Sequence, residues 1–280
     1  MKADCHMHMV LDGVNWKSAI ARHKDNPQED FIRNALQTYK DLGYTYLRDG
    51  GDKWGVGAKA RELAPDYGIT YRTPLSPLCK AGHYGAFIGT AFENAAEFAR
   101  QVVNIRKNGG DFIKIMISGL MDFHQFGVLS EPGLAQKEIT ELVHIAKEEG
   151  MSVMVHANGA DTVIAAAESG ADSVEHGAYL DRNALDAMKD AGAVWVPTLS
   201  TIGNLLGKGR FPDDQVKEIL DSALQNVSDF AEMGGLLASG TDAGAWAVPH
   251  GSATEEGYFA MASVGEKVLA RGLEVIRQKF

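Results

Sequence analysis

The sequence has little cysteine, no long apolar run and no cluster of basic residues. Two of its 280 residues are cysteine, too few for the disulfide framework of a small secreted domain. Charged residues or glycines break every apolar run well before the about 18 residues that a membrane-spanning helix needs. The net charge of -10 opposes binding to phosphate backbones and anionic lipids. We therefore expect a small-molecule substrate, with neither nucleic acid nor membrane as a partner.

No positively charged segment followed by an apolar one precedes the polar run 2–8, so we expect a cytoplasmic protein. Apolar residues make up 45% of the chain and charged residues 23%, close to the averages of globular proteins, so a sizeable core can be buried. Barrels of alternating strands and helices often reach this length as one domain. We expect a single domain over residues 1–280, and the sequence leaves a homo-oligomer open.

Short runs rich in β-formers alternate with longer segments of helical periodicity, a pattern typical of βα units and a parallel sheet. The clearest helix, 213–233, has apolar residues at steps of three and four and ends at a pair of glycines. The predicted strands are 3–9, 44–49, 69–74, 112–118, 152–157, 172–177, 194–199 and 236–241. The predicted helices are 30–42, 91–107, 135–149, 161–169, 181–191, 213–233 and 255–271.

Eight parallel strands can form either a closed barrel or an open, doubly wound sheet. The open sheet usually carries a glycine-rich phosphate loop after its first strand, whereas this sequence has His6-Met7-His8 there. The sequence therefore favours an α/β fold of the (β/α)8 TIM-barrel type, with a metal site at the carboxyl ends of its strands. The long connections 10–29 and 75–90 would then lie over the catalytic face.

His6 and His8 lie two apart on the first predicted strand, so both side chains project from the same face and can bind one ion. A lone His-x-His pair is a weak signal, and two packed or surface histidines would give the same pattern. Lys114 lies in an otherwise apolar strand, where an unpaired ammonium is costly to bury. It could form an internal ion pair, remain a neutral amine, or be carboxylated to a carbamate that bridges two metal ions.

Three more polar residues follow predicted strands. His156 and His176 end the fifth and sixth strands, and Asp242 follows the eighth. Residues at the carboxyl ends of barrel strands form the active sites of this fold. Asp242 alone could ligate a metal, accept a proton or cap a helix, but chance is a poor explanation for histidines, a lysine and an acid at five strand ends.

This order of motifs resembles the amidohydrolase superfamily. The strings 155–159 (Val-His-Ala-Asn-Gly), 175–177 (Glu-His-Gly) and 240–244 (Gly-Thr-Asp-Ala-Gly) are most similar to its branch of imidazolonepropionase-like hydrolases and metal-dependent Xaa-Pro or Xaa-Arg peptidases. Many members carry an additional small β-sandwich domain, which we expect to be absent here.

The resemblance implies two divalent ions per chain. His6, His8 and Asp242 would hold the more buried ion, His156 and His176 the more exposed one, and carboxylated Lys114 would bridge them. These donors suit zinc, and manganese, iron or cobalt would fit the same ligands.

Such a site predicts hydrolysis of a carbon–nitrogen bond by metal-activated water, with Asp242 and Lys114 as the catalytic residues. The substrate would be a dipeptide, an N-acyl amino acid or an imidazolone-like ring. A lactonase or phosphotriesterase could use the same binuclear site, and a non-catalytic metal-binding barrel is a further alternative.

Four loop residues are candidates for substrate binding: His83, Tyr84, His124 and Tyr179. The glycines beside His83 and Tyr84 suit close approach to a ligand, although His83 could equally be a solvent-exposed loop histidine. Arg48, at the end of the second strand, could bind an acidic substrate group or form an ion pair at the rim.

Overall fold

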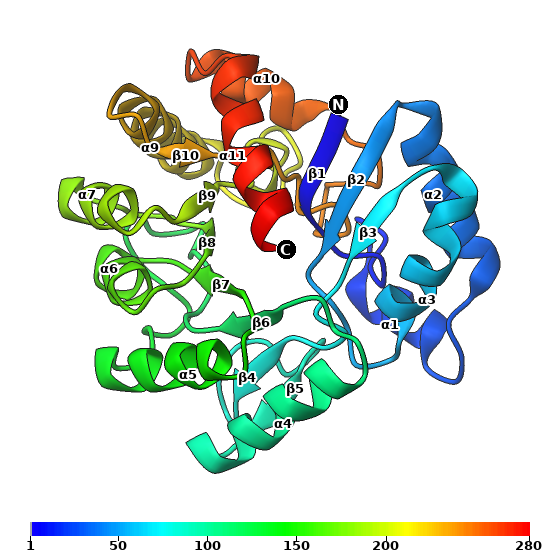
Figure 1. Ribbon diagram of the computed structural model, residues 1–280. Coiled ribbons are helices and arrows are strands. Elements are labelled where there is room, and N and C mark those ends of the chain that lie inside the picture. Colours follow the sequence, from blue (N-terminus) through cyan, green and yellow to red (C-terminus); the bar gives the residue numbers. More distant parts are fainter. Residues whose placement is uncertain (1) are drawn as a thin grey trace.

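The computed structural model describes residues 2–280 as alternating strands and helices, with the strands inside and most helices around them (Figure 1). The strands form a three-stranded sheet in the order β1-β2-β3 and a seven-stranded sheet in the order β10-β9-β8-β7-β6-β4-β5. Every pairing within them is parallel. The strands are β1 (Lys2–Met7), β2 (Tyr44–Asp49), β3 (Thr70–Arg72), β4 (Leu78–Lys80), β5 (Thr90–Phe92), β6 (Ile113–Met116), β7 (Val153–Ala157), β8 (Ser173–His176), β9 (Val194–Val196) and β10 (Leu236–Leu237).

Helices lie in most of the connections between strands, which is the usual arrangement of a parallel sheet. They are α1 (Trp16–His23), α2 (Glu29–Asp41), α3 (Val56–Leu63), the 3-10 helix η1 (Ala64–Tyr67), α4 (Ala95–Lys107), α5 (Gln136–Glu148), α6 (Ala160–Glu168), α7 (Arg182–Ala191), α8 (Ser200–Gly203), α9 (Asp213–Glu232), α10 (Thr254–Met261) and α11 (Glu266–Lys279).

Backbone hydrogen bonds link the two sheets in two places, one at the β10 edge of the larger sheet and one beside its interior strand β6. The amide of Cys5 in β1 donates to the carbonyl of Ser239, just after β10, at 2.8 Å. The amide of Asp111, just before β6, donates to the carbonyl of Thr73, just after β3, at 2.9 Å. β1 therefore runs beside the segment that follows β10, and the end of β3 lies beside the start of β6.

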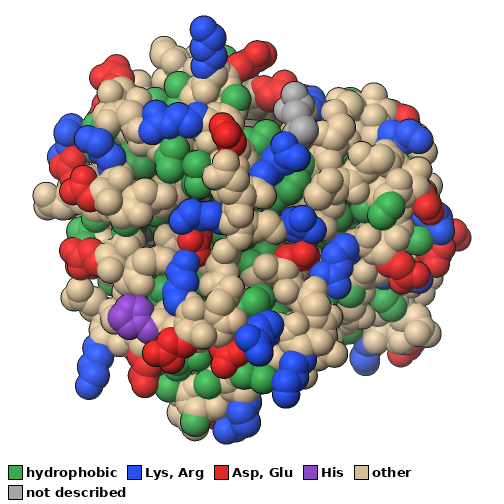
Figure 2. All heavy atoms as spheres, in the orientation of Figure 1, with side chains coloured by type: hydrophobic (Ala, Val, Ile, Leu, Met, Phe, Trp, Pro, Cys, Tyr) green, Lys and Arg blue, Asp and Glu red, His purple; other side chains and the backbone are tan. Residues whose placement is uncertain are grey.

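The strands of both sheets share one apolar interior. Cys5 and Tyr46 from the smaller sheet pack in one cluster with Met154, Val194 and Ala238 from the larger sheet and the segment after it. β6 and β7 are buried along their whole length, which is why their sequences are almost continuously apolar. The outer surface mixes acidic and basic side chains (Figure 2).

Each of the eight predicted strands corresponds to an observed one, and the parallel α/β prediction is confirmed. β4 and β5 are additional and lie within or at the end of the connection 75–90, where short three-residue strands give no detectable pattern. The connection 10–29 contains the unpredicted helix α1. The single helix expected over 255–271 was wrong: α10 and α11 are separate, with Ser263 in the left-handed region at φ 59° between them. Within residues 2–280, no helix has the length and apolarity to cross a membrane.

Candidate metal centre and active site

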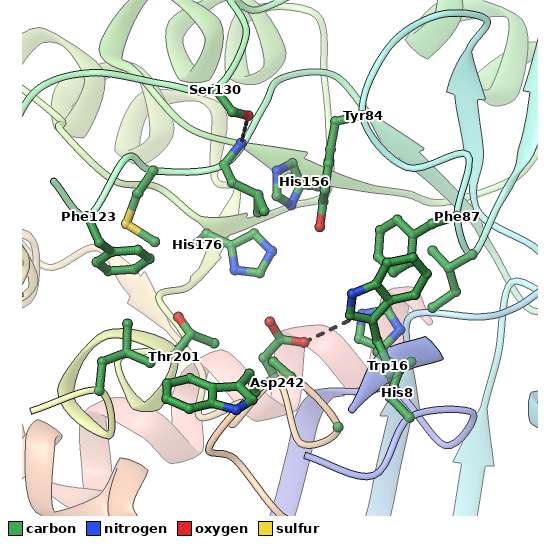
Figure 3. A pocket seen from close by; sticks show the side chains of 18 of the residues that line it. His8, Trp16, Tyr84, Phe87, Phe123, Ser130, His156, His176, Thr201 and Asp242 are labelled. Atoms are coloured by element: carbon green, nitrogen blue, oxygen red, sulfur yellow. Dashed lines mark hydrogen bonds and ion pairs between the residues drawn. The ribbon is translucent and has the colours of Figure 1, made fainter. Parts of the chain in front are cut away.

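A cavity of about 940 Å³ opens at the carboxyl ends of the strands. The loops after β1, β4, β6, β7, β9 and β10 contribute to its walls, and aromatic side chains surround its polar centre (Figure 3). The residues predicted to bind metal all line it: His6, His8, Lys114, His156, His176 and Asp242.

His6, His8 and Asp242 form a compact group of donor atoms. One donor atom from each lies within 4.8 Å of the others. Oδ1 of Asp242 is 3.6 Å from Nε2 of His6 and 3.5 Å from Nε2 of His8, too long for good hydrogen bonds but suited to three ligands around one cation. Nε2 of His6 is buried without any hydrogen-bond partner among residues 2–280. These donors fit a divalent ion.

His156 and His176 extend this group on the next strands. Their ring centroids are 4.5 Å apart, and the His176 ring is 5.0 Å from that of His6. Nδ1 of His176 lies 2.7 Å from the hydroxyl of Thr198, so Nε2 is free for a ligand. Nε2 of His156 lies 3.2 Å from the carbonyl of Gly119, so Nδ1 is free. Such partners on the second ring nitrogen fix the tautomer that binds metal.

Lys114 is almost fully buried, and its Nζ atom has no hydrogen-bond partner within the described chain. No carboxylate of residues 2–280 lies within ion-pair distance of it, so the internal ion pair considered from the sequence does not form. Burial lowers the pKa of the amine. A neutral amine is the form that adds to CO2, and the residue therefore fits a carbamate ligand.

Burial controls the protonation of the other ligands. It lowers the pKa of both His8 and His156 to about 3, and that of His6 and His176 well below the ordinary value. These imidazoles are neutral at pH 7 and offer lone pairs to a cation. Burial also raises the pKa of the Asp242 carboxyl, and a bound cation would restore its ionised form.

A buried network beneath the cavity was not predicted. Nδ1 of His6 donates to Oε2 of Glu175 at 2.7 Å, while Oε1 of Glu175 accepts from Arg48 at 2.8 Å and from Ser173 at 2.6 Å. The side chains of Arg48 and Glu175 are fully buried. The rim position expected for Arg48 was therefore wrong. The sequence gives no clear signal for Glu175, because its strand, Ser173–His176, is mostly polar.

The backbone is unusual where the ligands are held. His176 and Asp242 have positive φ angles of 70° and 55°, which residues other than glycine rarely adopt. Gly50 leaves room for His8, because a Cβ atom at Gly50 would lie 2.1 Å from Cε1 of the His8 ring.

Of the four candidates for substrate binding, Tyr84 lines the cavity. Its ring centroid is 5.0 Å from that of His156, and its hydroxyl points into the central space (Figure 3). His83, His124 and Tyr179 do not line the cavity.

Neighbouring loop residues hold those three side chains. Nδ1 of His83 is 3.7 Å from Glu131, the ring of His124 packs on that of Phe211, and the hydroxyl of Tyr179 donates to the backbone of Asp122.

A cavity lined by histidines, a carboxylate and a buried amine at the carboxyl ends of parallel strands defines a class of α/β enzymes with a metal-competent site. The sequence pattern of the amidohydrolase family matches residues 64–270. The chain belongs to this family.

The chain is 26% identical to an ochratoxinase from Aspergillus niger, over 94% of this chain and 60% of that protein. It therefore spans about 60% of the length of this curated relative. Among solved structures, it is similar to a Xaa-Pro dipeptidase with bound methionine in the active site (TM-score 0.78, 22% identity), covering 99% of this chain and 75% of that one.

The crystal structure of Aspergillus niger ochratoxinase is also similar (TM-score 0.74, 22% identity), over 99% of this chain and 69% of that one. A prolidase complexed with N-methylphosphonate-L-proline gives a TM-score of 0.74 at 20% identity, over 99% and 74%. At these identities the likeness establishes the shared fold.

Proposed function

We propose that this chain is a metal-dependent amidohydrolase that cleaves a carbon–nitrogen bond of a small molecule. The observation that carries the proposal is the convergence of His6, His8 and Asp242, whose donor atoms lie within 4.8 Å of one another. His156, His176 and Lys114 line the same cavity. We further propose that both sheets close into one (β/α)8 barrel, supported by the backbone hydrogen bonds between the two sheets, and that residues 1–280 form one domain.

Two divalent ions would fit these residues, with zinc suiting the donors and manganese, iron or cobalt as substitutes. His6, His8 and Asp242 would hold one ion, and His156 and His176 the other. Lys114 would bridge them after its neutral amine adds to CO2, which forms a nitrogen–carbon bond and releases one proton. When bound, such ions lower the pKa of water and polarise a carbonyl group.

The chain's own residues supply the proton transfers. Asp242 faces the centre of the cavity (Figure 3), where its carboxylate can take a proton from the attacking water and pass it to the leaving nitrogen. The reaction adds the hydroxyl group of water to the carbonyl carbon and a proton to the nitrogen, so the carbon–nitrogen bond breaks. The hydroxyl of Tyr84 can donate a hydrogen bond to the carbonyl oxygen as negative charge develops on it.

The names of the relatives support this bond type, because prolidases and Xaa-Pro dipeptidases act on peptide bonds. A cavity of about 940 Å³ has room for a molecule larger than a dipeptide. We propose a dipeptide, an N-acyl amino acid or an imidazolone-like ring as substrate.

The test combines metal analysis with a substrate panel. Protein purified without chelator should contain about two ions per chain, and it should hydrolyse amides in a panel that also contains lactones and an activated phosphotriester. Turnover of a lactone or the phosphotriester alone would replace the amidohydrolase assignment with a lactonase or phosphotriesterase. No bound metal after reconstitution, with no turnover, would refute the proposal.

A further inference from the structure

The mouth of the cavity carries two positive side chains that no carboxylate neutralises. Lys17 in α1 and Arg210 in the segment before α9 both line the cavity and are exposed. Within residues 2–280, neither side chain forms an ion pair or a hydrogen bond. In a chain with a net charge of -10, this local positive charge opposes the overall sign and attracts anions.

Aromatic rings hold both cations in place. Nζ of Lys17 lies 5.4 Å from the ring centroid of Trp16. The guanidinium of Arg210 lies 4.7 Å from the ring centroid of Trp246 and 5.2 Å from that of Phe211. Such stacking orients a cation without neutralising it, so its N–H donors remain available to a ligand.

The cavity lies between two aromatic walls. Trp16 and Phe87 pack edge to face on one side, with ring centroids 5.5 Å apart. On the opposite side Phe123 packs on Phe211 at 5.0 Å, and Figure 3 shows Phe123 across the cavity from Trp16 and Phe87. Flat apolar surfaces on both sides favour a flat apolar group between them.

Apart from Asp242, one acidic side chain of the described residues lines the cavity. It is that of Asp122, whose Oδ1 atom accepts a hydrogen bond from the backbone amide of His124 at 2.8 Å. It forms no ion pair with Lys17 or Arg210 in the described chain. The two cations therefore outnumber the acid at the mouth.

We propose that the mouth of the cavity is an anion-binding subsite, which selects molecules that carry both an aromatic group and a carboxylate. Arg210 binds the carboxylate, Lys17 adds positive charge from the Trp16 side of the mouth, and the aromatic group lies between the two walls. The preferred substrate is then an amide with an aromatic part and a negative charge. This inference rests on the proposed function for its substrate, but the subsite is testable by binding alone.

The experiment measures binding of 4-phenylbutyrate and of 4-phenylbutanol, its neutral counterpart, by calorimetry on metal-loaded protein. Neither probe has an amide bond, so hydrolysis does not interfere. We expect the acid to bind at least about tenfold more tightly than the alcohol. Arg210→Gln should weaken binding of the acid about tenfold and leave the alcohol unchanged, and Lys17→Gln should have a smaller effect.

Arg277→Gln is the matched control, because Arg277 is also exposed and has no ion pair within residues 2–280, yet does not line the cavity. It should leave binding of both probes unchanged. Acid binding that survives Arg210→Gln would place the carboxylate on the metal ions and overturn the proposal. Equal binding of acid and alcohol, or no binding of either, would also overturn it.

This result is separable from the proposed function. Arg210-dependent binding together with an inactive amide panel would retain the subsite and refute the amidohydrolase. Turnover of neutral and anionic amides at equal rates, with no effect of Arg210→Gln on binding, would retain the enzyme and refute the subsite.

Discussion

The carboxylate of Glu175 accepts a hydrogen bond from Nδ1 of His6 at 2.7 Å, and both side chains are fully buried. This contact places the proton on Nδ1 and directs Nε2 toward Asp242. Glu175 is in turn held by the guanidinium of Arg48. The network thus links the buried guanidinium of Arg48, through Glu175, to the His6 ring whose Nε2 atom would bind metal.

We expect Glu175→Gln to weaken metal binding about 10- to 100-fold, the usual effect of removing a carboxylate behind a metal-binding histidine. Competition with a chromogenic chelator measures this affinity without any assay of turnover. Glu218→Gln is the control, because Glu218 is exposed on α9 and has no ion pair in the described chain. Equal affinity of the two variants would show that Glu175 does not position His6.

Lys114→Ala removes the buried amine, which has no hydrogen-bond partner among residues 2–280. We expect the variant to bind about one ion where the wild type binds about two, because the bridging ligand is lost. Elemental analysis after dialysis provides the count. Wild type reconstituted in CO2-depleted buffer should show the same deficit, reversed by bicarbonate; an unchanged metal count in both experiments would rule out a carbamate on Lys114.

Gly50→Ala should displace the His8 ring, since the added Cβ atom would lie 2.1 Å from its Cε1 atom. We expect loss of metal affinity with the fold retained, seen as weaker chelator competition and an unchanged circular dichroism spectrum. Gly257→Ala, in α10, provides the comparison because nothing lies within 4 Å of the position of its Cβ atom. If Gly50→Ala binds metal as well as Gly257→Ala does, the packing against His8 is not needed for the site.

His250 predicts a pH dependence of stability away from the metal ligands. Burial lowers its pKa from 6.5 to about 4, so the unfolded chain binds a proton before the folded one does. Its contribution is present above pH 6.5 and is lost as the pH falls toward 4.

The measurement is the free energy of unfolding by urea at pH 7.5 and pH 5, with zinc bound. Between these values we expect His250 to account for about 1 to 2 kcal/mol of lost stability. His250→Gln should lose stability by that much less over the same range. An identical pH dependence in both proteins would contradict the prediction.

Local pattern was sufficient to predict most of the fold and the candidate ligands. Apolar strands such as 153–157 are recognisable because both of their faces are buried, and a polar residue within or at the end of a strand stands out. His156, His176 and Lys114 were found in this way. α1 escaped prediction because its eight residues are only partly apolar, so they do not form a long periodic pattern.

Contacts between distant segments could not be predicted. The pair Arg48 and Glu175 is separated by 127 positions, and nothing local to either residue identifies the other. The aromatic walls could not be predicted for the same reason. Trp16 contacts Phe87, and Phe123 contacts Phe211, only once the loops have folded over the strands. Candidate metal ligands on strands are therefore easier to predict from the sequence than candidate substrate-binding residues on loops.

The group formed by His6, His8 and Asp242 joins an early strand to a late segment of the chain. During synthesis on a ribosome, the two histidines leave the exit tunnel long before Asp242 does, so the complete ligand set cannot exist until Asp242 has emerged. A cation captured at that moment would fasten the last strand against the first. Metal supply would then govern the yield of folded protein as well as the rate of its reaction.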